Sequence, residues 1–426
     1  MRNFTVITLG CPKNIVDSRH LIESLKKEGF FYVEEFKRAD FILINTCCFI
    51  GEAKEESIDE ILTATKFKAN RNLIVFGCLS ERYGKELKVE IPEIDALFGV
   101  NEMDKIIDFM LQFRKEGVES AKNTKYTVEP DSFRYLKIAE GCSRKCSFCI
   151  IPDIKGKFRS INPDEIIKEA EGFIKAGIKE LILVAQDITQ YGKELNGYRL
   201  PHLLRDLSKI SGDFWIRLLY LYPTDIEENL IDVIANEVKI VKYLDIPMQH
   251  SEDRILRLMG RRGTRKEYLK KIKEIREAIP GVTLRSTFIV GFPTEREDEF
   301  QRLVDFIEEI QFDWIGVFKY SREEGTKAYN LKEQIPESVK EKRYDEIMLR
   351  QAVISLEKNR SLIGKKYEAL IDYVDGDLAI GRLYCHAPEI DGVLFLDNVG
   401  NLKSGDKVKV HITEAYEYDV KGVLAL

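Results

Sequence analysis

Apolar runs and amphipathic stretches alternate along the first 125 residues of the chain. In one stretch Ile15, Ile22 and Leu25 recur at helical intervals up to a stop at Gly29. The apolar runs before, between and after such stretches are FTVITLG, FILINT and LIVFG. This alternation is typical of a parallel sheet with crossover helices. We therefore predict an α/β domain over residues 1–125.

A second block of strand and helix patterns follows a polar stretch, residues 115–132, which we interpret as a linker. One of its helices is expected to begin at Asn162, a capping residue that precedes Pro163. Its six strand-like runs are FRYLKIAEG, ELILVAQ, FWIRLLY, YLDIPM, VTLRSTFIVG and WIGVFKY. Six units are fewer than the eight of a closed barrel, so we predict an open six-unit (β/α) partial TIM barrel over residues 130–358.

The pattern changes once more near the carboxyl end. A long charged helix is expected at about residues 337–359. After Gly364 come short alternating runs, broken by Gly, Asp and Asn. We predict a small all-β barrel over residues 361–426, which makes the whole chain an α/β protein with a β-barrel appended.

Length and composition limit the class of protein. A chain of 426 residues exceeds one ordinary core, and its 44% apolar and 32% charged residues are typical of a globular protein. We find no apolar run of about 18 residues and no signal-peptide pattern at the start, so we expect a cytoplasmic protein without a membrane span. The net charge of −6 argues against a whole-protein electrostatic grip on nucleic acid.

The eight cysteines carry the strongest chemical signal. In a reducing cytosol clustered cysteines indicate metal ligands or catalytic groups rather than disulfides. GCSRKCSFC places Cys142, Cys146 and Cys149 on one short loop after a predicted strand. Three thiolates can hold three corners of a 4Fe-4S cluster and leave the fourth iron open for chemistry. A zinc site is the alternative, but structural zinc usually takes four ligands and no fourth Cys or His lies nearby.

A second set of cysteines emerges only when the strands are assigned first. Cys11, Cys47 and Cys78 each follow a predicted strand of the first domain. Carboxyl ends of parallel strands share one edge, so these thiols are expected to converge on a second three-thiolate metal site. Chance burial of cysteine is the alternative. Cys48 must point elsewhere if the strand continues, and Cys385 has no companions, so we assign neither to a metal.

The Cys-x-x-x-Cys-x-x-Cys array, with aromatic Phe148 before its last cysteine and six strand-helix units around it, resembles the radical S-adenosylmethionine superfamily. The resemblance implies that the open iron binds S-adenosylmethionine and cleaves it to a 5'-deoxyadenosyl radical. The family's glycine-glycine-glutamate motif is missing, because VAQD stands in its place, and we take Gln186 as the substitute. Gln249, Arg285 and Gly291 are further candidate cofactor contacts, each with a purely structural role as the alternative.

The motifs LGCPKN, NTC and GC at 9–14, 45–47 and 77–78 are similar to those of the methylthiotransferases. The family's domain order, with a three-cysteine domain, a radical barrel and a C-terminal TRAM barrel, would cover essentially the whole chain. Membership implies two 4Fe-4S clusters and S-adenosylmethionine. The radical would abstract hydrogen from the substrate, and the resulting carbon radical would take up methylated sulfur from the auxiliary cluster. Both clusters must then face one cavity.

Three motifs resemble the RimO branch of that family rather than the tRNA-modifying MiaB branch. LGCPKN stands where the tRNA enzymes typically show YGCQMN, and the other two motifs are QDITQYG at 186–192 and HAPEIDG at 386–392. The C-terminal segment 361–426 has a net charge of −4, which suits a basic protein better than RNA. An acidic surface that is merely solvated is the alternative interpretation.

The RimO resemblance implies methylthiolation of the β-carbon of an aspartate in ribosomal protein S-twelve. The expected partners are that protein, free or in the ribosomal subunit, and an electron donor such as flavodoxin or ferredoxin. The main alternative is a tRNA adenosine methylthiotransferase, although tRNA is the less favoured partner. A remote alternative is a non-enzymatic, metal-stabilised RNA-binding or assembly protein.

Overall fold

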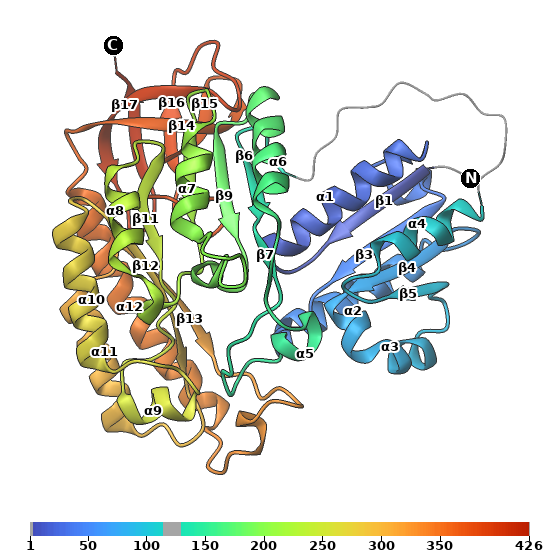
Figure 1. The fold of residues 1–426 in the computed structure, drawn as a ribbon, viewed down its shortest axis with the longest axis horizontal. Coiled ribbons are helices and arrows are strands. Elements are labelled where there is room, and N and C mark those ends of the chain that lie inside the picture. The colour runs from blue at the N-terminus through green and yellow to red at the C-terminus, as the bar shows by residue number, and fades with distance from the viewer. Residues whose placement is uncertain (1–2, 114–128, 426) are drawn as a thin grey trace.

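Two parallel sheets and a closed β-barrel follow one another along the chain (Figure 1). The structure, a computed structural model, describes residues 3–113 and 129–425. Most of the predicted linker, residues 115–132, lies outside these ranges. Within the described ranges, no helix combines the length and the apolar character that a membrane crossing requires. The α/β class and the appended barrel agree with the sequence-based prediction.

The first sheet has five parallel strands in the order β2-β1-β3-β4-β5. Its central strand β3 is buried at every position because helices α1 and α4 cover one face and α2 and α3 the other. The short β2 and β5 were not predicted. The strands are β1 (Asn3–Thr8), β2 (Phe31–Tyr32), β3 (Phe41–Thr46), β4 (Asn72–Gly77) and β5 (Ala96–Phe98). The helices are α1 (Pro12–Lys27), η1 (Phe36–Arg38), α2 (Gly51–Thr65), α3 (Cys78–Glu90) and α4 (Met103–Leu111).

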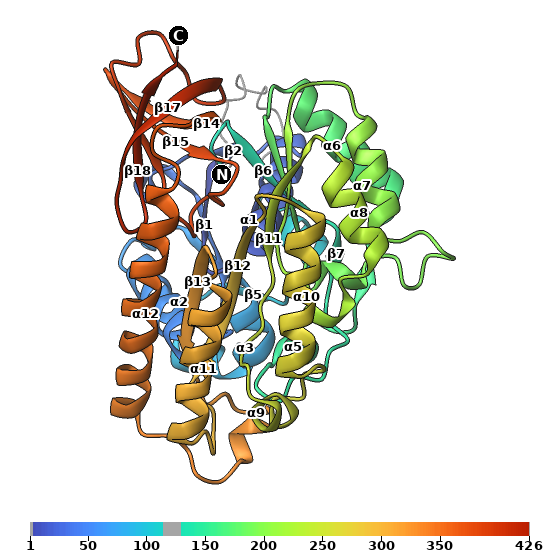
Figure 2. The ribbon, with the colours of Figure 1, turned by 90° about the vertical axis from the view of Figure 1, so that its left-hand side faces the viewer.

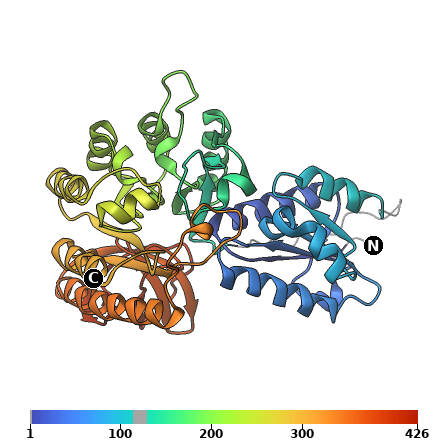
Figure 3. The same ribbon diagram turned by 90° about the horizontal axis from the view of Figure 1, so that it is seen from below.

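The second sheet has six parallel strands in chain order and two unpaired edges, so it forms an open half-barrel. Its helices lie in an arc around the outer face (Figure 3). Asn162 caps α6 as predicted, accepting a hydrogen bond from the Asp164 N–H at 2.9 Å. The strands are β6 (Phe133–Lys137), β9 (Glu180–Val184), β10 (Trp215–Leu218), β11 (Ile240–Asp245), β12 (Thr283–Val290) and β13 (Trp314–Lys319).

The six longer helices of the half-barrel pack their apolar sides on the sheet, and shorter elements form its connections. The longer helices are α6 (Pro163–Lys175), α7 (Leu200–Lys209), α8 (Glu228–Asn236), α10 (Arg265–Ala278), α11 (Glu297–Ile310) and α12 (Glu337–Arg360). The shorter elements are β7 (Ala139–Glu140), α5 (Ile151–Lys155), β8 (Arg159–Ser160), η2 (Ile188–Gln190), η3 (Pro223–Asp225), α9 (Asp253–Leu258) and η4 (Ala328–Asn330). Helix α12 leads into the C-terminal barrel (Figure 2).

The C-terminal barrel closes in the strand order β14-β15-β16-β18-β17. All of its pairs are antiparallel except β16 with β18. The last strand, β18, was not predicted from the sequence. The strands are β14 (Lys366–Asp375), β15 (Leu378–Leu383), β16 (Leu394–Asp397), β17 (Lys407–Ala415) and β18 (Val420–Leu424).

The C-terminal barrel covers part of the inner face of the half-barrel, the face that the helices leave free. Its segment 386–391 places His386 against the ring of Trp314, with centroids 5.6 Å apart. Asp391 accepts a hydrogen bond from Tyr243 Oη at 2.6 Å, and Glu389 accepts one from Tyr135 Oη at 2.9 Å. These contacts lie below the carboxyl ends of the strands, which leaves those ends uncovered by the barrel.

A fully buried carboxylate joins the two parts. Glu180 on β9 accepts hydrogen bonds at 2.6 Å from Arg217 of β10 and at 2.6 Å from Arg382 of β15. Arg382 also pairs with Asp372 on β14 at 2.6 Å. Because buried charges are tolerated only when they are paired, this cluster fixes how the C-terminal barrel sits on the sheet.

Candidate active site

A cavity of about 480 Å³ lies where the first domain meets the carboxyl ends of the half-barrel strands. Its walls come from both parts of the chain and are mainly apolar. Six of the eight cysteines line it, namely Cys11, Cys47, Cys78, Cys142, Cys146 and Cys149. The structure therefore brings both predicted trios of thiols to one space.

The first trio lies at the ends of three adjacent strands. Cys11 precedes α1 after β1, Cys47 follows β3, and Cys78 is the first residue of α3 after β4. The chain before Cys11 passes so close to Cys47 that a Cβ on Gly10 would lie 2.7 Å from the Cys47 sulfur. Gly10 also has a φ of +89°. Glycine is therefore favoured here both by the lack of space for a Cβ and by the left-handed backbone conformation.

Cys48 turns away from the cavity, as the alternation of a strand predicts. Its thiol donates a hydrogen bond to the carbonyl of Cys78 at 3.2 Å, and it does not line the cavity. Burial raises the pKa of Cys48 to about 12. Cys385 lies in the C-terminal barrel, where burial likewise raises its pKa to about 12. Both residues remain packed thiols.

The second trio sits on the loop between β7 and α5. The backbone N–H of Cys142 donates to the carbonyl of Gly156 at 3.0 Å. Ser147 fixes the middle of the loop, since its N–H donates to Met259 at 2.8 Å and its hydroxyl donates to Leu258 at 2.7 Å. Both acceptors belong to the end of α9. The half-barrel thus holds these three thiols on a short anchored loop.

Burial favours the protonated form of four of the six thiols in the absence of a metal. It raises the pKa of Cys149 to about 12, and it also raises the pKa values of Cys47, Cys78 and Cys142. Thiolates are the form that binds metal, so occupation of either site must release protons. The free energy needed to deprotonate these buried thiols must come from strong metal-thiolate bonds.

The donor set fits an iron-sulfur cluster better than a single ion. In the described part of the chain, no three or more His, Cys, Asp or Glu side chains are arranged to hold one metal ion. Instead, each trio presents only thiols, and these stand around the walls of an open space. Soft thiolate ligands without nitrogen or oxygen partners are typical of iron-sulfur clusters.

The structure places three of the five predicted cofactor contacts at the cavity and two elsewhere. Phe148, Gln186 and Gln249 line it. Arg285 does not, because its guanidinium pairs with Asp245 at 3.2 Å and with Asp391 of the C-terminal barrel at 3.3 Å. Gly291 is also outside the lining.

Gly291 approaches another part of the protein rather than the cavity. A Cβ at this position would lie 2.3 Å from Cγ of Lys340 on α12. Its backbone N–H donates to the buried carboxylate of Glu295. Gly291 also has a φ of +69°. Glycine is therefore required at this position for the close packing of α12.

Gln186 offers an unused acceptor at the cavity wall. Its Nε2 donates to Glu140 Oε1 at 3.2 Å, while its own Oε1 is buried and has no hydrogen-bond partner among the described residues. Leaving a buried acceptor unpaired costs free energy, so a donor from a bound ligand is expected here. An ammonium group is one such donor.

Two lining residues adopt backbone conformations that are unusual for non-glycine residues. Tyr220 has a φ of +64° and Gln249 a φ of +72°. The backbone N–H of Gln249 donates to Thr287 at 2.7 Å, which holds that conformation in place. Strain of this kind persists only where the surrounding structure enforces it, and it clusters at functional sites.

Two lysines at the cavity, Lys13 and Lys155, were not predicted from the sequence. Burial lowers the pKa of Lys13, but the opposing effects of Cys11, Tyr220 and Glu140 outweigh it and leave the pKa raised. Lys155 likewise has a raised pKa, because Asp17 and Glu140 outweigh its burial. Lys13 belongs to the LGCPKN motif, so a signal for it was present.

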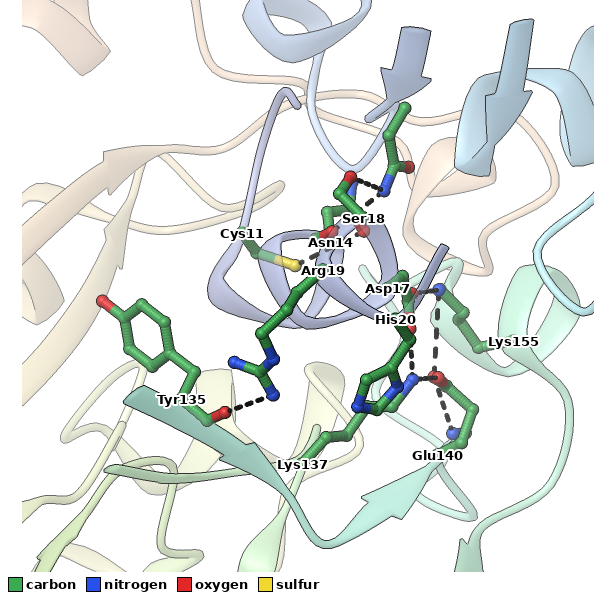
Figure 4. A network of polar contacts seen from close by, with 12 residues as sticks. Cys11, Asn14, Asp17, Ser18, Arg19, His20, Tyr135, Lys137, Glu140 and Lys155 are labelled. Carbon is green, nitrogen blue, oxygen red and sulfur yellow. Dashed lines mark hydrogen bonds and ion pairs between the residues drawn. The ribbon is translucent and has the colours of Figure 1, made fainter. Parts of the chain in front are cut away.

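An ion-pair network joins the two walls of the cavity (Figure 4). Asp17 on α1 pairs with Lys137 of β6 and, at 3.4 Å, with Lys155 of α5. Glu140 pairs with Lys137 at 2.8 Å. The helix that begins after Cys11 is thereby tied to the segments before and after the second trio.

Known families match the chain in three segments. The profile of the radical SAM superfamily matches residues 136–307, and that of the TRAM domain matches residues 363–424. A family described only as uncharacterised, UPF0004, matches residues 3–99. These segments correspond to the half-barrel, the C-terminal barrel and the first sheet.

Solved structures with the same fold include TsrM, a radical S-adenosylmethionine methyltransferase from Kitasatospora setae. Its TM-score is 0.56 at 13% identity over 95% of this chain and 84% of that one. The cobalamin-dependent radical enzyme OxsB gives a TM-score of 0.53 at 14% identity over 84% of this chain and 56% of that one. At such identities the likeness shows the fold alone.

Curated relatives are far more similar. The ribosomal protein uS12 methylthiotransferase RimO of Thermodesulfovibrio yellowstonii is 76% identical over the full length of both chains. RimO of Thermoanaerobacter sp. strain X514 is 46% identical over 99% of this chain and 100% of its own. With its half-barrel and cysteine loop, the chain is a radical S-adenosylmethionine enzyme. It belongs to the RimO family of ribosomal protein uS12 methylthiotransferases.

Proposed function

We propose that the chain adds a methylthio group to the β-carbon of an aspartate in uS12. The observation that carries this proposal is the shared cavity, because all six thiols of the two trios line it. A carbon radical must meet its sulfur partner before it is quenched, and a common cavity meets that need. We place the three parts of the enzyme at residues 1–125, 130–358 and 361–426.

In this proposal each trio holds one 4Fe-4S cluster, with Cys142, Cys146 and Cys149 on the side of S-adenosylmethionine. When bound, the clusters and S-adenosylmethionine supply the electron, the hydrogen-abstracting radical and the methylated sulfur. The protein positions the reacting groups and excludes water from them. Gln186 Oε1 is free to accept a hydrogen bond from the amino group of S-adenosylmethionine, and Phe148 and Gln249 line the same wall.

The cavity walls keep water from the reacting atoms. Apolar side chains dominate the lining, among them Ile50, Leu221 and Ile154. Phe49 and Phe318 also line the cavity but are 40% and 47% exposed, which places them at its mouth. A substrate side chain that passes them would close the opening and exclude solvent while the chemistry takes place.

Variants of the two trios test whether one trio serves cleavage of S-adenosylmethionine and the other serves methylthio transfer. Cys146→Ala should abolish formation of 5'-deoxyadenosine by the reconstituted enzyme. Replacing Cys11, Cys47 and Cys78 together by Ala should preserve that cleavage but stop methylthio transfer to uS12. Cleavage at the wild-type rate in Cys146→Ala, or transfer by the triple variant, would show that the assignment is wrong.

The substrate is tested in cells that lack the protein. The acidic C-terminal segment, with a net charge of −4 over residues 361–426, favours a basic protein over tRNA. Mass spectrometry of ribosomal proteins and of tRNA from a deletion strain separates the two, because the modification that disappears identifies the substrate. We further propose that the enzyme works in the cytoplasm with a flavodoxin or ferredoxin as reductant.

A further inference from the structure

Two buried lysines line the cavity, and only one of them has an ionic partner. Lys155 is 4% exposed, and its ammonium lies 3.4 Å from Asp17 and 3.9 Å from Glu140. Lys13 is 8% exposed, yet within residues 3–113 and 129–425 its ammonium forms no hydrogen bond or ion pair. Its ammonium lies over the ring of Tyr220, 4.4 Å from the ring centroid.

An ammonium buried without an anion is costly, and a cation-π contact offsets only part of that cost. Glu140 is already engaged, since it pairs with Lys137 at 2.8 Å and accepts a hydrogen bond from Gln186. No carboxylate of the described residues pairs with Lys13, although a cluster held by Cys11, two residues before it, would add negative charge at this wall. Because the side chain of Lys13 lines the cavity, a bound molecule can supply an anion.

The position of Lys13 indicates which bound group this is. It is the second residue of α1, two residues after Cys11, so it belongs to the wall of the first trio. The amino end of this 16-residue helix adds its own positive potential at the same place. Gln186 and the Cys142 loop lie on the half-barrel wall. An anion bound at Lys13 thus sits beside the sulfur-donating side of the cavity.

We propose that Lys13 binds the side-chain carboxylate of the substrate residue and thereby selects an aspartate. This inference rests on the proposed function. In aspartate the β-carbon is bonded directly to the carboxylate carbon, so a carboxylate held at Lys13 brings that carbon to the wall of Cys11, Cys47 and Cys78. Glutamate would place its γ-carbon there instead, and asparagine would offer no charge.

The test measures the affinity of each enzyme variant for two substrate peptides. Peptides of uS12 that carry the modified aspartate, or asparagine in its place, are titrated anaerobically into reconstituted enzyme. We expect wild-type enzyme to bind the aspartate peptide about tenfold more tightly than the asparagine peptide. Lys13→Met should lose this preference by weakening the aspartate peptide alone, and Lys13→Arg should retain it.

Lys27→Met is the matched control. It removes the same charge from the exposed last turn of the same helix and should leave both affinities unchanged. Iron content and the visible spectrum establish that each variant carries its clusters. Where methionine disturbs folding, Lys13→Gln repeats the comparison with a polar side chain of similar length.

The opposite result overturns the inference. If the Lys13 variants still prefer aspartate tenfold, the carboxylate is bound elsewhere. If they shift the reduction potential of the auxiliary cluster and leave both affinities unchanged, Lys13 only compensates the charge of that cluster. Failure of the proposed function looks different, because wild-type enzyme would then add no methylthio group to uS12 at all.

Discussion

Oδ2 of Asp17, in the helix that follows Cys11, lies 3.4 Å from Nζ of Lys155, in the helix that follows Cys149. The same carboxylate accepts a hydrogen bond from Lys137. All three side chains are at most 10% exposed, so the ion pairs are only weakly screened by solvent. The contact joins the wall of one cysteine trio to the wall of the other.

Asp17→Asn should uncouple the two half-reactions. The substitution leaves two buried ammonium groups short of a partner, and we expect a loss of about 3 kcal/mol in the free energy of unfolding. Cleavage of S-adenosylmethionine should continue, while methylthio product per 5'-deoxyadenosine falls about tenfold because a misplacement of about 1 Å is costly. Both products are measured by mass spectrometry in one reaction.

An exposed pair provides the control for Asp17→Asn. Glu277 is 67% exposed and lies 3.8 Å from Lys273 on α10, and neither residue lines the cavity. Glu277→Gln should change the free energy of unfolding by less than about 0.5 kcal/mol and leave the product ratio intact. An unchanged product ratio in Asp17→Asn would contradict the role given to this contact.

Gln186→Leu should weaken the binding of S-adenosylmethionine. The variant keeps the volume of the side chain but removes the buried acceptor that has no partner in residues 3–113 and 129–425. We expect the KM for S-adenosylmethionine to rise about tenfold, as for the loss of a hydrogen bond to a charged group. Steady-state formation of 5'-deoxyadenosine measures it. An unaltered KM would assign Gln186 to the support of Glu140 alone.

His386→Phe should make the protein less sensitive to acid. Burial, together with Arg217 and Arg382, lowers the pKa of His386 to about 3 from 6.5. Between these values the unfolded chain binds a proton that the folded chain does not, so wild-type stability falls as the pH drops from 6.5 toward 3. The expected loss is up to about 1.4 kcal/mol per pH unit.

Thermal unfolding of both proteins between pH 7.5 and pH 4.5 measures this effect. The difference in Tm between His386→Phe and wild type should be constant above pH 7 and grow in favour of the variant below pH 6.5. A difference that stays constant throughout would mean that His386 gains a proton or a partner in the folded protein. The ring packs on Trp314, so phenylalanine preserves the aromatic contact.

Glu180→Gln should loosen the C-terminal barrel. Two buried guanidinium groups, Arg217 and Arg382, depend on this carboxylate, and the cost of breaking such a cluster is about 3 to 5 kcal/mol. Limited proteolysis should then cut faster at the turn after α12. Asp213→Asn removes a pair with Lys407 across the same contact, but Asp213 is 71% exposed, so cutting should stay at the wild-type rate.

The cysteine sites were accessible from sequence because their signals are local. A strand followed at once by a cysteine locates Cys11, Cys47 and Cys78, and parallel pairing alone brings three such ends to one edge. The strand periods also predicted every strand of the half-barrel sheet. Strands of two or three residues, such as β2 and β5, could not be predicted because they are too short to show a period.

The sequence did not reveal contacts that come from distant segments. Arg285 and Gly291 were expected at the cofactor, but their surroundings come from Asp391 and Lys340, on elements far along the chain. No local pattern reports such contacts. Lys13 could have been found, because a lysine between a predicted site cysteine and a predicted helix must lie near that cysteine.

The segment from His386 to Asp391 contacts the inner face of the half-barrel through Trp314, Tyr135 and Tyr243. Phe49 and Phe318 are exposed apolar side chains of the lining, at 40% and 47%. A target side chain that enters past these rings would reach the thiols only from a protruding point of its own backbone. Entry by that route would select targets by shape as well as by chemical group.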